Sequence, residues 1–498
     1  MNRTWRSRLL VLGTAAATTL AVATPVLAAP GATFNIRDYG AKGDGKAIDS
    51  PAIDKAISAA SAAGGGVVEV PAGTYLSRSI HLKSDITVNL AAGSKIIAAG
   101  SGMDKPEPNE FDDYQDFGHS HFRNALIWGE HVSNVHFTGA GTIDGDNKLE
   151  TSNTPASGVA DKAISLKFCQ NVTFTGITMR QGGHFAVLAN GCDGMRFSRV
   201  KILTSEDRDG INIINSSNVE VADSLVEASD DAVVFKSDYA LGRTFVSRHN
   251  VVRDSTIKST ENNALQFGSE TCGDFRDHRF SNLKITGAGK AGLGIVSMDG
   301  SVIEDVHYDN ITLTRTTAPI FLHVGKRSRC PGKPPAGKIR NITFTGISGT
   351  NLTSPTTVPG GPEHTSTITG RTDSAIENVS FTNVRLTVPG NHPASDANRV
   401  PPENSTEYPP RIFGVRPSFG FWIRHAKDIS FTGSTFEFDK NDGRPAFLAN
   451  DTSGVVINGV RVERSTGLYD VTFQKSSGQS VTGSSTTSGA ELRTRTQN

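Results

Sequence analysis

The chain has 498 residues, and its 50 Lys and Arg balance its 50 Asp and Glu, so the formal net charge is zero. This balance excludes the basic footprint of a nucleic-acid-binding protein. No apolar run beyond the N-terminal region approaches the roughly 20 residues that cross a bilayer, so no membrane partner is expected.

Residues 1–28 predict an export signal. Arg3, Arg6 and Arg8 precede a long apolar run, and Val26, Leu27 and Ala28 form a small-residue cleavage site. We expect cleavage after Ala28 and a soluble, secreted protein. The alternative is a segment that is retained as an anchor.

A short helix is predicted near the start of the mature chain. Apolar residues have helical spacing at Ile53, Ala56, Ile57 and Ala60. Ser50 and Pro51 provide an N-cap and a first-turn proline, and the glycines at 64–66 provide a stop. Such a helix can cover the exposed first coil of a stacked β structure.

A degenerate unit, Asn-Val-x-Phe-Thr-Gly, recurs along the chain. Its clearest copies begin at Asn134, Asn171, Asn341, Asn378 and Asp428. Each copy alternates apolar with polar residues after a turn former, which is typical of a strand buried on one face. Repeats of this kind predict an all-β parallel β-helix in a single domain over residues 29–475.

Three segments interrupt or end this pattern. Residues 354–372 and 390–411 are rich in Pro, Thr, Ser, Asn and Gly, and they are either disordered or build walls of a groove. Residues 476–498 are rich in Ser, Thr and Gly, and we expect an unstructured tail.

Four cysteines are too few for a disulfide framework but are compatible with an oxidising compartment. Cys169 and Cys192 lie about one coil apart, which is within the range that a disulfide tolerates. We therefore predict a bridge between these two.

Asp209 and the pair Asp230 and Asp231 lie about one repeat apart, and each precedes a short aliphatic run. Neighbouring strands of a parallel sheet are roughly 4.8 Å apart, so three carboxylates can share one patch. Such a patch separates the pKa values of its members, which suits acid and base catalysis. Both members of the pair can face a substrate only at a turn or bulge. The alternative is that these residues only punctuate turns.

Three segments carry a resemblance to a known family. FNIRDYGAKGDG at 34–45, DRDGINI at 207–213 and DDAVVFKS at 230–237 resemble glycoside hydrolase family 28, the polygalacturonase family. The resemblance implies a right-handed parallel β-helix and inverting hydrolysis of glycosidic bonds in pectin. It also implies that Asp230 is the general acid and that Asp209 and Asp231 act as the base. As a proton donor, Asp230 is expected to have a pKa raised by its two neighbouring carboxylates.

Two motifs of the family are missing. Asn263 stands where the family has the His of Gly-His-Gly, and residues 293–298 offer no cation where Arg-Ile-Lys holds a galacturonate carboxylate. The replacing segments are similar to a bacterial branch of the family. We therefore expect rhamnogalacturonan or branched fragments to be better substrates than plain polygalacturonate.

Further side chains are candidates for substrate contacts, and Lys236 could alternatively lower the pKa of Asp231. The candidates are Lys236, Asn263, Gln266, Glu270, His184 and Asp299, with Arg327, Arg424 and His425 as weaker candidates. Turn-lining or surface roles are the alternatives. The expected partner is a polysaccharide or oligosaccharide, the protein is expected to be a monomer, and no cofactor or metal is expected.

Two other functions remain open at this point. A polysaccharide lyase on the same fold would hold Ca²⁺ on the acidic cluster and use a base such as Lys236. A non-catalytic carbohydrate-binding solenoid would use the same surface without turnover.

Overall fold

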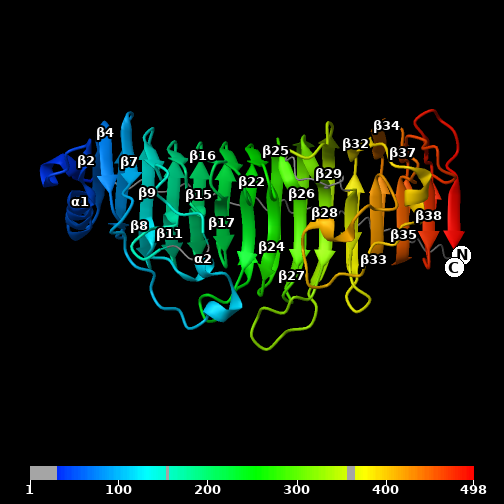
Figure 1. Cartoon of the computed structure of the whole chain (residues 1–498), viewed down its shortest axis with the longest axis horizontal. Coiled ribbons are helices and arrows are strands. Elements are labelled where there is room, and N and C mark those ends of the chain that lie inside the picture. Colours follow the sequence, from blue (N-terminus) through cyan, green and yellow to red (C-terminus); the bar gives the residue numbers. More distant parts are fainter. Residues whose placement is uncertain (1–30, 153–155, 356–364, 498) are drawn as a thin grey trace, which may run out of the picture. The chain divides into compact units, whose positions relative to one another are not determined.

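The alternating Val, Ile, Phe and Thr segments form short strands, which pair in parallel with the strands of the preceding and following coils. The computed structural model describes residues 31–152, 156–355 and 365–497. Within these residues the chain is a right-handed parallel β-helix, as predicted, and successive coils stack side by side in Figure 1.

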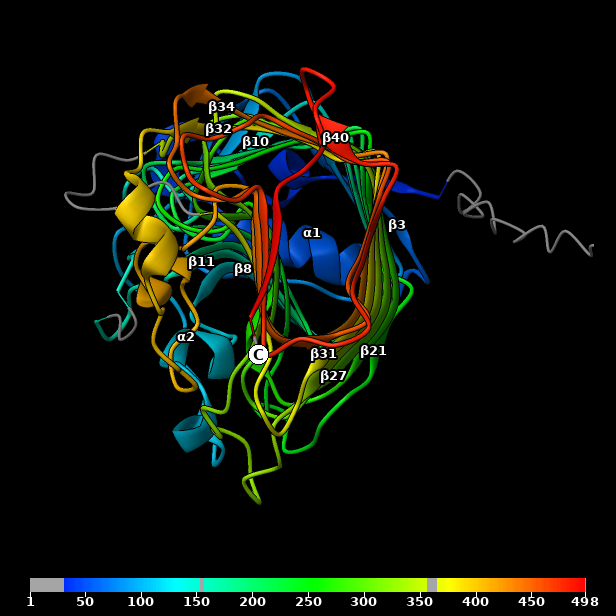
Figure 2. The ribbon, with the colours of Figure 1, turned by 90° about the vertical axis from the view of Figure 1, so that its right-hand side faces the viewer.

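The coils build three sheets around one apolar core (Figure 2). The first sheet, which carries the site described below, contains β5 (Ile80–His81), β8 (Ala125–Glu130), β11 (Lys162–Lys167), β14 (Phe185–Asn190), β17 (Asp209–Ile214), β20 (Val233–Ser237), β24 (Leu265–Thr271), β26 (Ala288–Ser297), β28 (Thr316–Val324), β30 (Ser366–Thr369), β33 (Phe421–Thr432), β35 (Phe447–Ser453), β38 (Val471–Gln474) and β41 (Thr494–Gln497).

The second sheet contains β1 (Thr33–Asn35), β3 (Gly66–Val70), β6 (Ile86–Leu90), β9 (Ser133–Gly139), β12 (Gln170–Thr175), β15 (Asp193–Ser198), β18 (Ser217–Ala222), β22 (Val251–Arg253), β25 (Phe275–Ile285), β27 (Val302–Leu313), β29 (Lys338–Gly349), β31 (Ile376–Thr382), β36 (Val456–Asn458) and β39 (Ser480–Thr482), and β33 continues into it. The third contains β2 (Asp44–Ile48), β4 (Gly73–Ser77), β7 (Ser94–Ala98), β10 (Thr142–Asp144), β13 (Thr178–Arg180), β16 (Lys201–Thr204), β19 (Leu225–Ala228), β23 (Thr256–Ser259), β32 (Arg385–Gly390), β34 (Thr435–Lys440), β37 (Arg461–Val462) and β40 (Ser485–Thr486), and β25, β27 and β29 continue into it between β23 and β32.

The recurring Asn-Val-x-Phe-Thr-Gly unit acts at two levels. Its Asn takes a left-handed backbone conformation, with φ of 54° at Asn134 and 50° at Asn171, which Asn tolerates better than most residues. The side chain of Asn171 donates to that of Asn134 over 2.8 Å, so the turns form a ladder. The Phe stacks in the core, and the Phe137 and Phe174 rings are 4.9 Å apart. This distance matches the spacing of parallel strands.

The predicted N-terminal helix is present as α1 (Ser50–Ala62), at the first coils in Figure 1. Its buried face includes the predicted residues Ile53, Ala56, Ile57 and Ala60. The N-cap is Asp49 rather than Ser50, and Asp49 makes no capping hydrogen bond through its side chain. Its carboxylate instead accepts from the backbone N–H groups of Lys42 and Gly43 in the preceding turn.

All four cysteines form disulfides. The predicted bridge between Cys169 and Cys192 is confirmed, and it joins adjacent coils with a Cα–Cα distance of 4.5 Å. Cys272 and Cys330 form a second bridge, with a Cα–Cα distance of 5.7 Å across 58 positions of sequence. Coil spacing alone could not indicate this pair, because Cys330 lies in a loop.

The prediction of an unstructured tail is wrong for most of residues 476–497. Strands β39, β40 and β41 add a last coil, which pairs with β36, β37 and β38. Low apolar content suggested disorder, but the open edge of the preceding coil supplies backbone partners, and Thr favours strands.

The segment 354–372 is also only partly a loop, since β30 lies within it. The segment 390–411 contains the 3-10 helix η3 (Ala394–Asn398) and the first part of η4 (Pro410–Phe413). Both helical turns lie outside the coils in Figure 2. The predicted export signal lies outside the described residues. Within the described part of the chain, no helix has the length and apolar character needed to cross a bilayer.

Candidate active site

Strand register in the first sheet brings four polar residues into one row. Ile211 pairs with Val233, Val233 with Leu265, and Leu265 with Leu293. Three positions before these residues lie Arg208, Asp230, Asn262 and Lys290. Ladder hydrogen bonds continue to this row, because the Asp230 N–H donates to the Arg208 carbonyl and the Lys290 N–H donates to that of Asn262.

Side chains along this row contact one another. The Arg208 guanidinium lies 2.7 Å from Asp230 Oδ2, and the Asn262 amide donates to Asp230 Oδ1. Lys290 Nζ lies 3.2 Å from the Tyr408 hydroxyl and forms no ion pair with any described carboxylate.

A second row lies one residue further along each strand. It contains Asp209, Asp231 and Asn263, and the Asn263 amide donates to Asp231 Oδ1 over 2.8 Å. Asp209 accepts from Asn212 through Oδ2, whereas its buried Oδ1 has no hydrogen-bond partner among the described residues. Asp230 and Asp231 lie in a bend before β20, as we expected, and both reach the same cleft.

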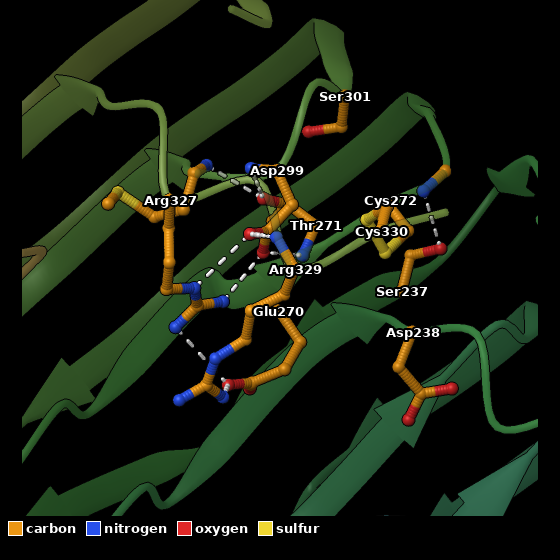
Figure 3. Close-up of a disulfide and its surroundings, with 12 residues drawn as sticks. Ser237, Asp238, Glu270, Thr271, Cys272, Asp299, Ser301, Arg327, Arg329 and Cys330 are labelled. Atoms are coloured by element: carbon orange, nitrogen blue, oxygen red, sulfur yellow. Dashed lines mark hydrogen bonds and ion pairs between the residues drawn. A yellow bond between two sulfur atoms is a disulfide. The ribbon is translucent and has the colours of Figure 1, made fainter. Parts of the chain in front are cut away.

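The opposite wall of the cleft is a network of ion pairs. Lys236 Nζ is 3.6 Å from Asp231 Oδ2 and 3.3 Å from Glu270 Oε2. Glu270 also faces Arg327 and Arg329, each at 3.6 Å. Figure 3 shows both guanidinium groups beside Glu270.

The loop that carries these arginines is held in two ways. Arg327 binds Asp299 through Nη2 and Nε, with the shorter distance 2.6 Å. The bridge between Cys272 and Cys330 fixes the middle of the loop to the residue that follows β24 (Figure 3). The wall is therefore positioned by covalent as well as ionic contacts.

These groups surround a cleft of about 300 Å³. It is lined by Asp116, His119, His184, Arg208, Asp209, Asp230, Asp231, Lys236, Asn262, Ser269, Glu270, Lys290, Arg327, Arg329 and Tyr408. The coils supply its floor, while the loops before β8, after β28 and before β33 supply its sides. Five acidic and five basic side chains in so small a volume favour binding of a polar ligand.

The three aspartates have pKa values that are driven apart. Burial, and next the charge of Asp230, raise the pKa of Asp209 well above its ordinary value. Burial also raises the pKa of Asp231, although Lys236 opposes it. Burial acts upward on Asp230 too, but the charge of Arg208 and its hydrogen bonds outweigh it and lower the pKa. The expected raised pKa of Asp230 is therefore wrong for the unliganded cleft, because Arg208 is its direct partner.

The two histidines of the cleft are neutral. Burial, and next the charge of Lys236, lower the pKa of His119 well below its ordinary value. Burial and Arg208 lower the pKa of His184 to about 3. Neither imidazole adds positive charge to the site near neutral pH.

Most of the residues predicted from sequence gather at this cleft. Its lining includes Asp209, Asp230, Asp231, Lys236, Glu270, His184 and Arg327. Asn263 and Asp299 lie behind it and hold lining side chains. Gln266 does not line the cleft and only approaches the Gly268 carbonyl. Arg424 and His425 lie elsewhere and contact Glu403.

Residues 293–298 carry no cation, as expected, but sequence reasoning missed Lys290, which lies earlier on the same strand β26 and reaches the cleft. Sequence reasoning also missed Arg208, Asn262, Tyr408 and His119 as lining residues. Paired residues on successive strands are 22, 32 and 28 positions apart, and counting these spacings from Arg208 leads to Asp230, Asn262 and Lys290. Tyr408 and His119 come from inserted loops, to which this count does not apply.

Comparison with known proteins places the chain in a family. The sequence profile of the glycosyl hydrolases family 28 matches residues 62–406. A polygalacturonase of Malus domestica is 25% identical over 348 residues, which cover 65% of this chain and 69% of that protein.

Two solved structures share the fold. The exopolygalacturonase of Thermotoga maritima has a TM-score of 0.61 at 16% identity, covering 82% of this chain and 92% of that one. The family 28 exopolygalacturonase of Yersinia enterocolitica has a TM-score of 0.63 at 20% identity, covering 88% and 79%. Fold and site thus define a β-helical glycoside hydrolase. The chain belongs to glycosyl hydrolase family 28 and is polygalacturonase-like.

The raised pKa of Asp209 predicts that Asp209→Asn stabilises the protein at pH 7. Because the folded-state pKa lies above the unfolded one, the stability of the native protein falls as pH rises between the two values. The Asn side chain does not ionise, so the variant does not lose stability in this pH range. The melting temperature of the variant should exceed that of the native protein at pH 7, and the difference should shrink as the pH is lowered.

The control is Asp223→Asn, at an exposed turn with φ of 53°, where Asn is tolerated. It should leave the melting temperature within error at every pH. A less stable Asp209→Asn protein at pH 7 would contradict the electrostatic description.

Proposed function

We propose that this chain is a secreted, inverting glycoside hydrolase that cleaves pectic glycans at the cleft described above. The observation that carries the proposal is the convergence of Asp209, Asp230 and Asp231, whose pKa values diverge. Acid and base catalysis need carboxyl groups of different proton affinity. In an inverting enzyme one of them protonates the leaving oxygen while another activates water.

The proton must change place during the reaction. Burial raises the pKa of Asp209, so this carboxyl group retains a proton more readily, while Arg208 lowers the pKa of Asp230 and favours its ionised form. Asp230 serves as the acid once a substrate separates it from Arg208, because loss of that cation raises its pKa. Asp209 then transfers its proton to Asp230, and the resulting Asp209 carboxylate acts with Asp231 as the base.

The cations of the cleft bear on the choice of sugar. Lys236, Arg327 and Arg329 are each paired with carboxylates of the chain itself, whereas Lys290 forms no ion pair within 4.0 Å among the described residues and contacts the Tyr408 hydroxyl. A single cation without an internal carboxylate suits one uronate per binding event. A backbone in which galacturonate alternates with a neutral sugar, as in rhamnogalacturonan, fits this arrangement better than consecutive galacturonates.

Export is part of the proposal and depends on the composition of residues 1–28. Two disulfides are in keeping with an oxidising compartment. We also propose that the enzyme acts as a monomer, without a cofactor.

Replacing Asp230 with Asn tests the catalytic assignment. The change keeps the shape and removes the proton donor, so turnover should fall by about 10²- to 10⁴-fold. The measurement is the release of reducing ends from pectic glycans, with Asp223→Asn as the control at full activity. Near-native turnover by Asp230→Asn would contradict the assignment of Asp230 as the general acid. An unsaturated sugar in the products would instead indicate a lyase.

Replacing Lys290 with Met tests the substrate assignment. Loss of a hydrogen bond to a charged group costs about 1.5–3 kcal/mol, so KM for rhamnogalacturonan fragments should rise by about 10- to 150-fold. Fragments whose carboxyl groups have been reduced to alcohols should show no such difference. Lys201→Met, at an exposed position, is the control.

The native enzyme should also turn over unesterified polygalacturonate more slowly than these fragments. The fragment preference is wrong if polygalacturonate equals or exceeds every branched substrate.

A further inference from the structure

The outer face of the first sheet extends well beyond the cleft. Ile211 and Ile213 of β17 point into the core, so Asn212 and Ile214 point outward. The same alternation places the side chains of Leu188 on β14 and Phe321 on β28 outward. On a bare sheet this face would be an open groove running along the stack of coils.

On the side towards the N-terminus, this face is covered. Phe122, which precedes β8, packs with Phe185, Leu188 and Ile214 in a buried apolar cluster that is separate from the main core. We call this cluster the N-side cover. Phe122 is only 2% exposed. The cover occupies the face where a glycan would continue past His184.

On the side towards the C-terminus, a second cluster covers the same face. It contains Ala291, Val296, Met298, Phe321, Phe413, Trp422 and Leu448, with Tyr408 and Ile412 packed against it. We call this cluster the C-side cover. Phe413 and Tyr408 come from the segment between β32 and β33, and Tyr408 also lines the cleft beside Lys290.

A third contact, at the rim of the cleft, joins two of the loops that form its sides. Arg329, after β28, lies 3.5 Å from Asp116, which precedes α2 (Phe117–Ser120) and lies on the segment leading to Phe122. The bridge between Cys272 and Cys330 holds the arginine side of this contact. A volume of about 300 Å³ lies at the lower end of the range of small-ligand pockets, about 300–1,000 Å³.

We infer that the enzyme acts at the ends of glycan chains, because the cleft is a pocket closed along the coil axis at both covers. This inference depends on the proposed function, which supplies the hydrolytic step. Only a terminal portion of a glycan can reach Asp209, Asp230 and Asp231, since a continuous chain would have to pass through the N-side or the C-side cover.

The test compares two properties of one digestion. A viscous pectic polymer that the native enzyme hydrolyses is followed by viscosity and by released reducing ends, and the products are sized from the first time point. We expect one short product from the start, with little loss of viscosity while reducing ends accumulate. Oligosaccharides labelled at the reducing end should yield one labelled product first.

Two other results would overturn the inference in distinguishable ways. Early loss of viscosity with products of many lengths would overturn action at chain ends and leave the proposed hydrolase function standing. Absence of hydrolysis of every pectic polymer and oligosaccharide would overturn the proposed function and this inference together.

A pair of variants tests the role of the cover itself. Phe122→Ala should open the N-side cover and raise the loss of viscosity per reducing end severalfold. The matched control is Phe111→Ala, on the same segment, where Phe111 packs on Tyr239 and not on the cover. Equal behaviour of the two folded variants would contradict closure by the N-side cover.

Discussion

The in-register backbone ladder of the first sheet is the constraint on which the site depends. Parallel pairing sets neighbouring coils about 4.8 Å apart, whatever side chains they carry. It therefore brings Arg208, Asp230, Asn262 and Lys290 into one row although they span 83 positions of the sequence. Core residues beneath the row, such as Phe235 and Phe267, whose rings stack on paired strands, hold this register and so keep the charged groups together.

Opposed charges make that cluster tolerable. Arg208 neutralises Asp230, and Lys236 lies between Asp231 and Glu270, so Asp209 is left as the carboxyl group whose ionisation is most unfavourable. Under the proposed function, a substrate that enters this network breaks some of these pairs. Binding and proton transfer would then be linked, since the same contacts set both the access of the sugar and the proton affinity of each aspartate.

The parts that could be predicted from the sequence are those that repeat. The Asn and Phe positions of the repeat predicted the coils, and coil spacing predicted the aspartate cluster and the bridge between Cys169 and Cys192. Segment 390–411 was predicted to be disordered or to build a wall of a groove, and its Tyr408 lines the cleft. Which side chains of the inserted loops reach the cleft, such as Tyr408 and His119, could not be predicted, because the paths of these loops depend on distant contacts. The last coil was missed since its strands depend on the edge of the preceding coil and carry few apolar residues.

The most direct test of the central claim is the anomeric configuration of the first product, followed by proton NMR during early hydrolysis. Inversion by Asp230 as acid, with Asp209 and Asp231 activating water, predicts that the first reducing sugar has the anomeric configuration opposite to that of the cleaved bond. The other anomer should follow only at the rate of mutarotation. Initial release of the same anomer as in the substrate would mean retention and would contradict the roles given to the three aspartates.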